Sequence, residues 1–282
     1  AVRALDELLD YQSYPVIAAE LSTQKRRPLG VGIINFAYWL AKHETSYQEP
    51  NLELVDEYAE AWSYSLIKAS ADLAVEKGAI PGNMETKYGH GITPNQTYKK
   101  DVDELVKNNE RQDWKGLREQ LKATGIRNST LMALMPAETS AQISNSTNGI
   151  EPPRSYVSIK QSKHGVLKQV VPGYPYYKNK YDLLWEQKSP QGYLKIMAVL
   201  QKYIDQGISV NTSYNPEHYE DEKVPMSVLI QDILTFYKYG GKQLYYNNTY
   251  DGQGEIDVHK DDAQGELALS EIDDEDCESC KI

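Results

Sequence analysis

Cys277 and Cys280 are the only thiols in this 282-residue chain, and both lie within six residues of its end. Two thiols at this spacing can form a redox couple or half of a zinc site. A lone pair without a second such motif or nearby histidines makes zinc the poorer choice. A thioredoxin-like role would need a strand-to-helix turn, which the acidic surroundings do not offer. The pattern therefore predicts a dithiol that undergoes exchange with other disulfides.

A second candidate group is a loop that follows the apolar run at residues 131–135. It consists of Pro136, Ala137, Glu138, Thr139 and Ser140. A strand that delivers Thr and Ser to the start of a helix presents backbone N–H groups and hydroxyls to one point, which suits a phosphate. For an isolated Thr-Ser pair, however, an ordinary helix cap is the favoured interpretation.

A third candidate is the pair Tyr245-Tyr246, near the end of the last apparent strand. Adjacent tyrosines in a strand usually place one ring in the core and the other on the surface, because side chains alternate. The chain contains 22 tyrosines, so a pair of them is uninformative by itself. Core packing with one surface ring is the plain interpretation of these two residues.

The remaining polar clusters are interpreted as structural or surface groups. The five histidines lie at no spacing that is typical of metal ligands, so we expect no metal site in this chain. Lys25, Arg26 and Arg27, with Lys42 nearby, form a short basic cluster. Such a cluster is more often a solvated face than a binding site.

Three helices are predicted among the elements that must position these groups. Apolar residues recur at three- and four-residue steps over residues 54–73, and the glycine and proline that follow would end this helix. The same spacing recurs over residues 193–204. A third helix is predicted to begin at Pro225 and to stop at Gly240-Gly241.

Six short apolar runs are predicted to be strands. They cover residues 29–34, 130–135, 156–159, 166–171, 208–211 and 243–246. Short apolar runs that alternate with helices indicate βα units around a mainly parallel sheet, so the expected fold class is α/β. The third and fourth runs are expected to form a hairpin that turns at His164-Gly165.

Two segments depart from this pattern. Residues 82–124 are more polar and have fewer apolar anchors, so we expect a small α/β subdomain inserted between the main elements. From Asp251 to Ile282 the chain has twelve acids, two bases and few large apolar groups, which cannot offset the entropy of ordering. We expect residues 251–282 to form a flexible acidic tail that carries the cysteine pair.

The formal net charge of −11 belongs almost entirely to this tail, because residues 1–250 carry a net charge of only −1. A body near neutrality is not suited to the phosphate backbone of nucleic acid. No stretch approaches the roughly 20 apolar residues of a membrane helix, and the chain starts without a charged-then-apolar leader. We expect a soluble, cytoplasmic protein that binds neither nucleic acid nor a membrane.

Three segments together closely resemble the large-subunit family of class Ia ribonucleotide reductases. They are residues 127–153 with the run PAETSAQISNSTNGIEPP, the run QLYYNNT, and the terminal CESCKI. The resemblance covers essentially the whole chain, but only the C-terminal portion of the family's large subunit. It implies the C-terminal part of the family's ten-stranded α/β barrel, with residues 1–81 and 125–250 supplying barrel elements.

The resemblance also implies roles for the loop and the tyrosines. The positions that match the family's diphosphate-binding segment are Pro136, Ala137, Glu138, Thr139 and Ser140. They would bind the diphosphate of a ribonucleoside diphosphate substrate. Tyr245 and Tyr246 would link a radical source on the small subunit to an active-site cysteine, because each phenol passes an electron and a proton.

For Cys277 and Cys280, the resemblance implies a shuttle. They would re-reduce the active-site disulfide after each turnover and then be reduced by thioredoxin or glutaredoxin. Familiar members often place four residues between these cysteines, whereas this chain has two. A smaller ring could shift the redox potential or the preferred partner, while exchange itself remains chemically feasible.

By the same resemblance, this chain would be inactive alone. The family's chemistry needs a thiyl-forming cysteine and a reducing cysteine pair, and residues 1–276 contain no cysteine. The implied partners are the N-terminal part of the large subunit and the small subunit, which would hold the di-iron tyrosyl radical. No cofactor is expected on this chain. We interpret it as a separately encoded piece of a split large subunit.

The predicted helix at residues 224–239 would help form the groove for the small subunit's C-terminal peptide, as the corresponding family helix does. Two other interpretations stay open. One is a non-catalytic binding protein that captures the small subunit or a redoxin through its tail. The other is a free-standing dithiol reductase with thioredoxin-type turnover of its own.

Overall fold

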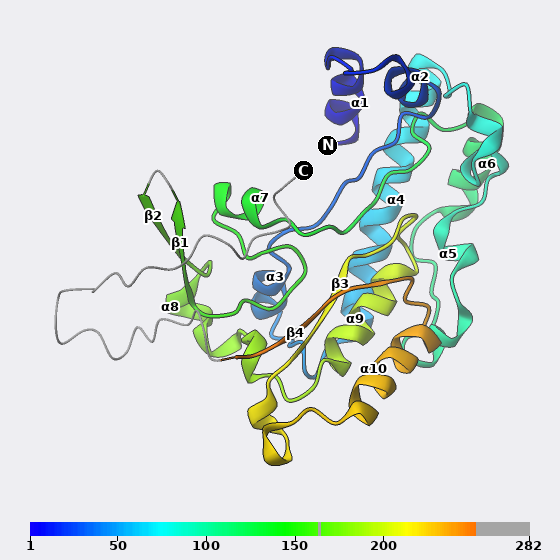
Figure 1. Ribbon diagram of the computed structural model, residues 1–282. Helices are drawn as coiled ribbons and strands as arrows, with labels where there is room; N and C mark the ends of the chain where they lie inside the picture. Colours follow the sequence, from blue (N-terminus) through cyan, green and yellow to red (C-terminus); the bar gives the residue numbers. More distant parts are fainter. Residues whose placement is uncertain (163–164, 252–282) are drawn as a thin grey trace. The chain divides into compact units, whose positions relative to one another are not determined.

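The computed structural model describes residues 1–162 and 165–251, which Figure 1 shows in colour. Residues 1–251 form one compact unit. Cys277 and Cys280, the predicted acidic tail beyond Asp251 and the turn residue His164 lie outside the described residues.

The chain folds into ten α-helices within the described ranges. They are α1 (Val2–Tyr11), α2 (Ile17–Arg26), α3 (Phe36–Lys42), α4 (Leu52–Lys77), α5 (Pro94–Thr97), α6 (Trp114–Thr124), α7 (Glu138–Ile143), α8 (Tyr174–Tyr177), α9 (Gln191–Gln201) and α10 (Met226–Lys238). Short 3-10 helices connect them at η1 (Asn83–Glu85), η2 (Tyr88–His90), η3 (Lys100–Glu104), η4 (Lys178–Lys180), η5 (Leu184–Glu186), η6 (Pro216–His218) and η7 (Glu220–Glu222). The strands are β1 (Val157–Ser162), β2 (Gly165–Val170), β3 (Val210–Tyr214) and β4 (Leu244–Thr249).

All three helices predicted from apolar periodicity are present as α4, α9 and α10. The side chain of Asn51 caps α4 by accepting a hydrogen bond from the Leu54 amide, and Gly78 follows its last residue. The apolar stripe of α4 faces the core and packs against α9, beside which it lies in Figure 1. Pro225 lies at the N-cap of α10, one position before the expected first turn.

Parallel backbone pairing joins four segments that are far apart in the sequence. Val31 pairs with Met132, Leu134 pairs with Ile208, and β3 pairs with β4, each in parallel. The order of these segments agrees with the predicted parallel arrangement and with the α/β fold class. The loop after residue 135 leaves one of these parallel segments, and β4 is another of them.

Residues 29–34 and 130–135 form isolated bridges rather than the regular strands that were predicted. The reason lies in a side chain that occupies two backbone donors of the second segment. The Asp205 carboxylate accepts hydrogen bonds from the amides of Leu131 (2.7 Å) and Met132 (3.0 Å). Gln206 donates to the carbonyls of Leu29 and Met132 from the same turn. Side chains therefore replace part of the strand ladder.

The described residues form no closed barrel. The regular sheets are two-stranded: β3 with β4 in parallel, and β1 with β2 in antiparallel pairing from Val157↔Val170 to Ser162↔Gly165. The antiparallel pair confirms the predicted hairpin, although its turn residue His164 lies outside the described residues.

Residues 82–124 contain η1, η2, α5, η3 and α6 and no strand, all of them within the described part of the chain. The strand content expected for an inserted α/β subdomain is therefore wrong. Helix-start and helix-stop residues dominate this segment: Thr93 forms a capping box with Gln96, and Asp113 caps α6 before Gly125 ends it. The proposed boundaries at residues 82 and 124 stay a prediction.

Two acids on α4 connect this helical segment to α9. Asp56 is buried and accepts hydrogen bonds from Lys202 (2.7 Å) and Tyr203 (2.9 Å) just beyond α9. Arg111 bridges Asp56 and Glu60 at 2.9 Å each. These ion pairs fix the end of α9 and the loop before α6 against the same face of α4.

A buried ion cluster joins α1 to the end of α2. Arg27, predicted to be part of a solvated face, is only 2% exposed. Its guanidinium donates to the carboxylates of Asp6 and Asp10, both at 2.7 Å. Arg127 donates to Asp6 from the opposite side at 3.2 Å. The prediction for Arg27 was wrong because neither acid is adjacent to it in the sequence.

We expect Asp6→Asn to lower the free energy of unfolding by about 3 kcal/mol, because removing one partner of a buried ion pair leaves charge without full compensation. Urea unfolding followed by circular dichroism would measure the loss. Glu76→Gln is the control, since it breaks the exposed Arg3–Glu76 pair and should cost far less. Equal losses in the two variants would contradict the assignment.

The stability difference should also depend on pH with a definite sign. Burial alone would raise the pKa of Asp6, but hydrogen bonds and charge from Arg27 and then Arg127 hold it below its usual value. A carboxyl with a lowered folded-state pKa stabilises the fold above its unfolded pKa and loses that contribution as the pH falls. The gap between wild type and Asp6→Asn should therefore shrink below pH 3.8.

Candidate functional site

The loop predicted to bind an anion lies at the start of α7. Ala137 is the N-cap residue, with no side-chain cap, and Glu138 to Ser140 form the exposed first turn. The first amides of a helix have no partner within the helix, so they are suitable donors to an anion. Because α7 has only six residues, its dipole is short and the neighbouring side chains must supply much of the geometry.

The loop closes on the segment before α3. Asn35 has a left-handed backbone conformation (φ 65°), its amide donates to the Thr147 carbonyl, and its side chain accepts from the Thr147 amide at 3.0 Å. Further along the loop, Asn148 accepts a hydrogen bond from the Ala137 amide at 3.3 Å. Residues on both sides of α7 are therefore fixed while its first turn stays accessible.

The tyrosine pair departs from the expected arrangement of one inward and one outward ring. Tyr245 and Tyr246 are 50% and 46% exposed, and their ring centroids lie 4.1 Å apart. The two hydroxyls are hydrogen-bonded at 3.2 Å. The rings therefore lie together on the surface, in contact through both the aromatic groups and the phenol oxygens.

A register shift between β3 and β4 explains this arrangement. Val210 pairs with Leu244, but Thr212 pairs with Asn247, so β4 has one residue more than β3 in this interval. Two residues on a bulged strand then oppose a single residue, here Asn211, and the alternation of side chains is interrupted. The bulge allows adjacent tyrosines to keep their rings side by side.

Asn211 joins the bulge to a carboxylate. Its side-chain oxygen accepts a hydrogen bond from the Tyr246 amide at 2.9 Å, and its Nδ2 donates to Glu151 Oε1 at 2.5 Å. The other carboxylate oxygen accepts from Asn148 Nδ2 at 3.4 Å. Since Asn148 also accepts from Ala137, a continuous series of hydrogen bonds connects the candidate anion loop with the tyrosine pair.

Glu151 borders a small cavity of about 20 Å³, which has room for a single water molecule. Burial raises the pKa of the Glu151 carboxyl, and the Asn211 hydrogen bond and the charge of Arg154 lower it in part. Two residues that line this cavity each carry a buried polar atom with no hydrogen-bond partner among the described residues. These atoms are Tyr193 Oη and Gln187 Nε2.

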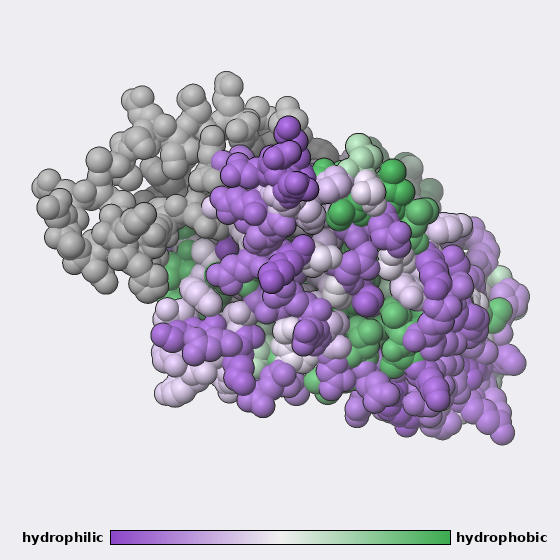
Figure 2. Space-filling view, turned by 90° about the horizontal axis from the view of Figure 1, so that it is seen from below, coloured by the Kyte–Doolittle hydropathy of each residue, from purple (hydrophilic) through white to green (hydrophobic). Residues whose placement is uncertain are grey.

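Helix α10 presents a row of large apolar side chains to the surface. The side chains in this row, each about half exposed or more, are Met226, Ile230, Ile233, Leu234 and Tyr237. Its buried face is held by Asp232, which accepts a hydrogen bond from Tyr214 at 2.9 Å and another from Gln191. Seen from the side on which α10 lies in Figure 1, apolar patches appear between hydrophilic residues (Figure 2).

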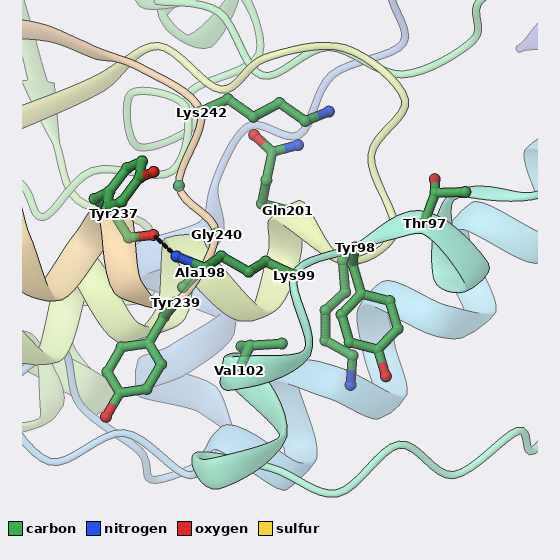
Figure 3. A pocket seen from close by; sticks show the side chains of 12 residues that line it. Thr97, Tyr98, Lys99, Val102, Ala198, Gln201, Tyr237, Tyr239, Gly240 and Lys242 are labelled. Atoms are coloured by element: carbon green, nitrogen blue, oxygen red, sulfur yellow. Dashed lines mark hydrogen bonds between the residues drawn. The ribbon is translucent and has the colours of Figure 1, made fainter.

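A larger hollow of about 300 Å³ lies where α9 and α10 end beside η3. Tyr98, Lys99, Gln201 and Lys242 contribute to its lining, and Lys99 donates to the Tyr237 carbonyl at 3.1 Å (Figure 3). Burial lowers the pKa of Lys242, whose ammonium donates to three backbone carbonyls. Of the residues predicted to carry chemistry, those that the structure describes do not line this hollow.

The described residues offer neither a metal-binding cluster nor a membrane-spanning helix. Within residues 1–162 and 165–251, no cluster of three His, Cys, Asp or Glu side chains could hold a metal ion. Over the same ranges, no helix combines the length and the apolarity needed to cross a bilayer. Cys277 and Cys280 lie outside these ranges, so their predicted dithiol chemistry stays a prediction.

Sequence reasoning gave no role to Asn148, Glu151 or Asn211. The first two fall within the stretch that carries the family resemblance, and Asn211 falls in a predicted strand. The available signal was a charged Glu151 between the apolar residues Ile150 and Pro152, which indicates a carboxylate that needs partners. Asn211, one of these partners, could not be identified because it is 60 positions away in the sequence.

Comparison with known proteins gives a consistent picture. The family model described as ribonucleotide reductase, barrel domain, matches residues 1–177 and 173–247. The ribonucleoside-diphosphate reductase 1 subunit alpha of Salmonella typhimurium is 54% identical over 277 residues, which cover 97% of this chain and 35% of that protein.

Two further relatives show the same partial coverage. The ribonucleoside-diphosphate reductase 1 subunit alpha of Escherichia coli K12 is 53% identical over 97% of this chain and 35% of its own length. The ribonucleoside-diphosphate reductase subunit alpha of Enterobacteria phage T4 is 46% identical over 100% of this chain and 36% of its own length. The chain therefore spans about a third of the length of these relatives.

The exposure of the tyrosine pair predicts how substitutions affect folding. Tyr245→Phe should change the free energy of unfolding by less than about 0.5 kcal/mol, because water can replace a hydrogen bond at a half-exposed hydroxyl. Tyr214→Phe, which removes the buried hydrogen bond to Asp232, should cost about 1.5 kcal/mol. Urea unfolding of both variants would test this, and a larger loss for Tyr245→Phe would contradict the surface placement.

Proposed function

This chain belongs to the family of ribonucleotide reductase barrel domains, and from that premise we propose that it contributes to the reduction of ribonucleoside diphosphates to 2′-deoxyribonucleoside diphosphates. Its contribution has three parts: an anion-binding loop, a tyrosine relay and a C-terminal dithiol. The chain spans 35% of its Salmonella relative, so the complete reaction requires the remaining large-subunit sequence. A cytoplasmic location follows from the same proposal.

The observation that carries this proposal is the contact between Tyr245 and Tyr246. Their hydroxyls lie 3.2 Å apart and their ring centroids 4.1 Å apart, at a half-exposed position. A phenol that gives up an electron must also give up its proton, so hydrogen-bonded neighbouring phenols suit radical transfer. Exposure leaves one side of the pair accessible to a radical source on another subunit.

The loop from Pro136 to Ser140 is proposed to bind the substrate's diphosphate. Its support is the exposed first turn of α7, where backbone amides and the hydroxyls of Thr139 and Ser140 gather on a short segment. Ala137 and Glu138 complete this proposed site. Hydrogen bonds from the Ala137 amide to Asn148 and from the Thr147 amide to Asn35 anchor the backbone on both sides of this turn.

Cys277 and Cys280 are proposed to return the active site to its reduced form. Reduction of the substrate converts two thiols to a disulfide and releases the 2′-hydroxyl as water. One tail thiolate attacks that disulfide, and the second tail thiol completes the exchange, leaving Cys277–Cys280 oxidised. Thioredoxin or glutaredoxin then reduces the tail. Because residues 1–276 contain no cysteine, the disulfide that is attacked belongs to the remaining large-subunit sequence.

Two surfaces are proposed to bind the other components. The exposed apolar face of α10 would receive a peptide of the small subunit, which would hold the di-iron tyrosyl radical. The exposed side chains Leu8, Tyr11, Ile17 and Leu21 on and around α1 and α2 would pack against the N-terminal part of the large subunit. The interpretation as a separately encoded piece of a split large subunit is tested by co-purification with that part.

We expect Tyr246→Phe to reduce turnover to the background of the assay, because phenylalanine has no phenolic proton and hydroxyl to take part in the relay. Substrate binding should be unchanged. The assay combines this chain, the remaining large-subunit sequence and the radical-bearing small subunit, with deoxyribonucleotide as the measured product. Tyr176→Phe on α8 is the matched control, since Tyr176 is an exposed tyrosine outside the pair. Retained turnover in Tyr246→Phe would refute the relay.

The Cys277→Ser/Cys280→Ser double variant should form about one equivalent of product per active site and then stop when thioredoxin is the reductant. A small dithiol such as dithiothreitol should restore turnover, because it can reach the active-site disulfide without the tail. Ser279→Ala, between the two cysteines, serves as the control. Continuous turnover of the double variant with thioredoxin would rule out the shuttle.

A further inference from the structure

In the hydrogen bonds around Glu151, the donor and the acceptor of each bond are fixed. The backbone amides of Ala137 and Tyr246 can only donate, so the side-chain oxygens of Asn148 and Asn211 must face them. This orientation turns the amino groups of both asparagines toward the carboxylate of Glu151. Each asparagine side chain therefore links a backbone amide on one side to a carboxylate oxygen of Glu151 on the other.

The group at the centre must accept at both oxygens. Asn148 Nδ2 donates to Oε2 and Asn211 Nδ2 donates to Oε1, and an ionised carboxylate satisfies both donors. A glutamine of the same shape would present an amino group to one of the two donors. The hydrogen-bond series therefore requires a carboxylate at this position, and a neutral side chain of the same size would not complete it.

The two ends of the series are the two candidate sites. Ala137 is the N-cap of the proposed diphosphate loop, and Tyr246 belongs to the proposed relay. We propose that Glu151 is a positioning residue that couples the two, so that binding of a nucleoside diphosphate at residues 136–140 changes the geometry of the Tyr245–Tyr246 contact. This inference rests on the function proposed above and adds a regulatory connection to it.

The surroundings of Glu151 provide a second arrangement for its carboxylate. Among the described residues, the buried hydroxyl of Tyr193 has no hydrogen-bond partner, and Tyr193 and Glu151 line the same small cavity. A carboxylate oxygen released by Asn148 or Asn211 can accept from this hydroxyl. A residue with two alternative sets of partners can respond to a ligand that favours one of them.

Charge connects the loop to Glu151 as well. Burial is the main reason that the pKa of Glu151 is raised, and the negative charge of Glu138, in the loop, adds a smaller contribution. A diphosphate in the same loop brings more negative charge and also competes for the backbone amides that now include the donor to Asn148. Both effects disfavour the arrangement present without ligand, and both reach Tyr246 through Asn211.

Three variants separate the two halves of the series. Asn148→Asp keeps the acceptor for Ala137 but replaces the donor to Glu151, whereas Asn211→Asp does the same on the Tyr246 side. Glu151→Gln disturbs both. Asn248→Asp on β4 is the matched control, because Asn248 Nδ2 donates to Ser213 Oγ at 3.4 Å outside the series. Kinetics are measured in the complex of this chain, the remaining large-subunit sequence and the small subunit.

In Asn148→Asp we expect a KM for the nucleoside diphosphate that rises by about tenfold with little change in kcat. In Asn211→Asp we expect the reverse, a kcat that falls by about tenfold with KM unchanged. Glu151→Gln should show both effects, and Asn248→Asp neither. Should Glu151→Gln fail to fold, each aspartate variant still tests the coupling, because it interrupts the series and should abolish the response of a fluorine label at position 246 to the nucleoside diphosphate.

A second readout follows the tyrosine directly. With 3-fluorotyrosine at position 246, addition of a nucleoside diphosphate should shift the fluorine resonance in the otherwise unchanged complex and leave it unshifted in Glu151→Gln. If Glu151→Gln behaves like Asn248→Asp in both readouts, the coupling is refuted. If Tyr246→Phe retains full turnover, the relay fails instead, and the fluorine shift still decides whether Glu151 couples the two segments.

Discussion

The tie between the turn at residues 205–206 and the amino ends of the parallel segments is the constraint on which the site depends. The Asp205 carboxylate accepts two consecutive backbone amides at residues 131–132, and Gln206 holds the carbonyls of Leu29 and Met132. Burial raises the pKa of Asp205, while these amides and the Tyr88 hydroxyl lower it in part. Because the start of the segment at residues 130–135 is fixed, the candidate anion loop that follows it leaves from a defined position.

The molecule separates the groups that stabilise its fold from those proposed to do chemistry. Asp6, Arg27, Asp56 and Lys202 are almost completely buried and paired with opposite charges. The first turn of α7 and the tyrosine pair are exposed by comparison. Glu151 belongs to neither class, because its side chain is partly buried and both of its carboxylate oxygens accept hydrogen bonds.

Much of this architecture was predictable from local patterns. The stripe at residues 54–73 predicts α4, and the alternation of short apolar runs with helices predicts the parallel order. Features that depend on distant partners were missed. Arg27 was assigned to a solvated face because Asp6 and Asp10 precede it by a whole helix. The bulge at Tyr245–Tyr246 is invisible in the sequence because it is defined by the register against β3.

That extra residue in β4 makes the length of the strand as important as its composition. Only Tyr245 and Tyr246 lie between Leu244 and Asn247, so deletion of either position would make the ladder regular and remove one ring of the pair. An inserted residue would displace the backbone donor that meets Asn211. Members of this family that preserve the aromatic contact should therefore tolerate changes of side chain near this strand more readily than gaps in it.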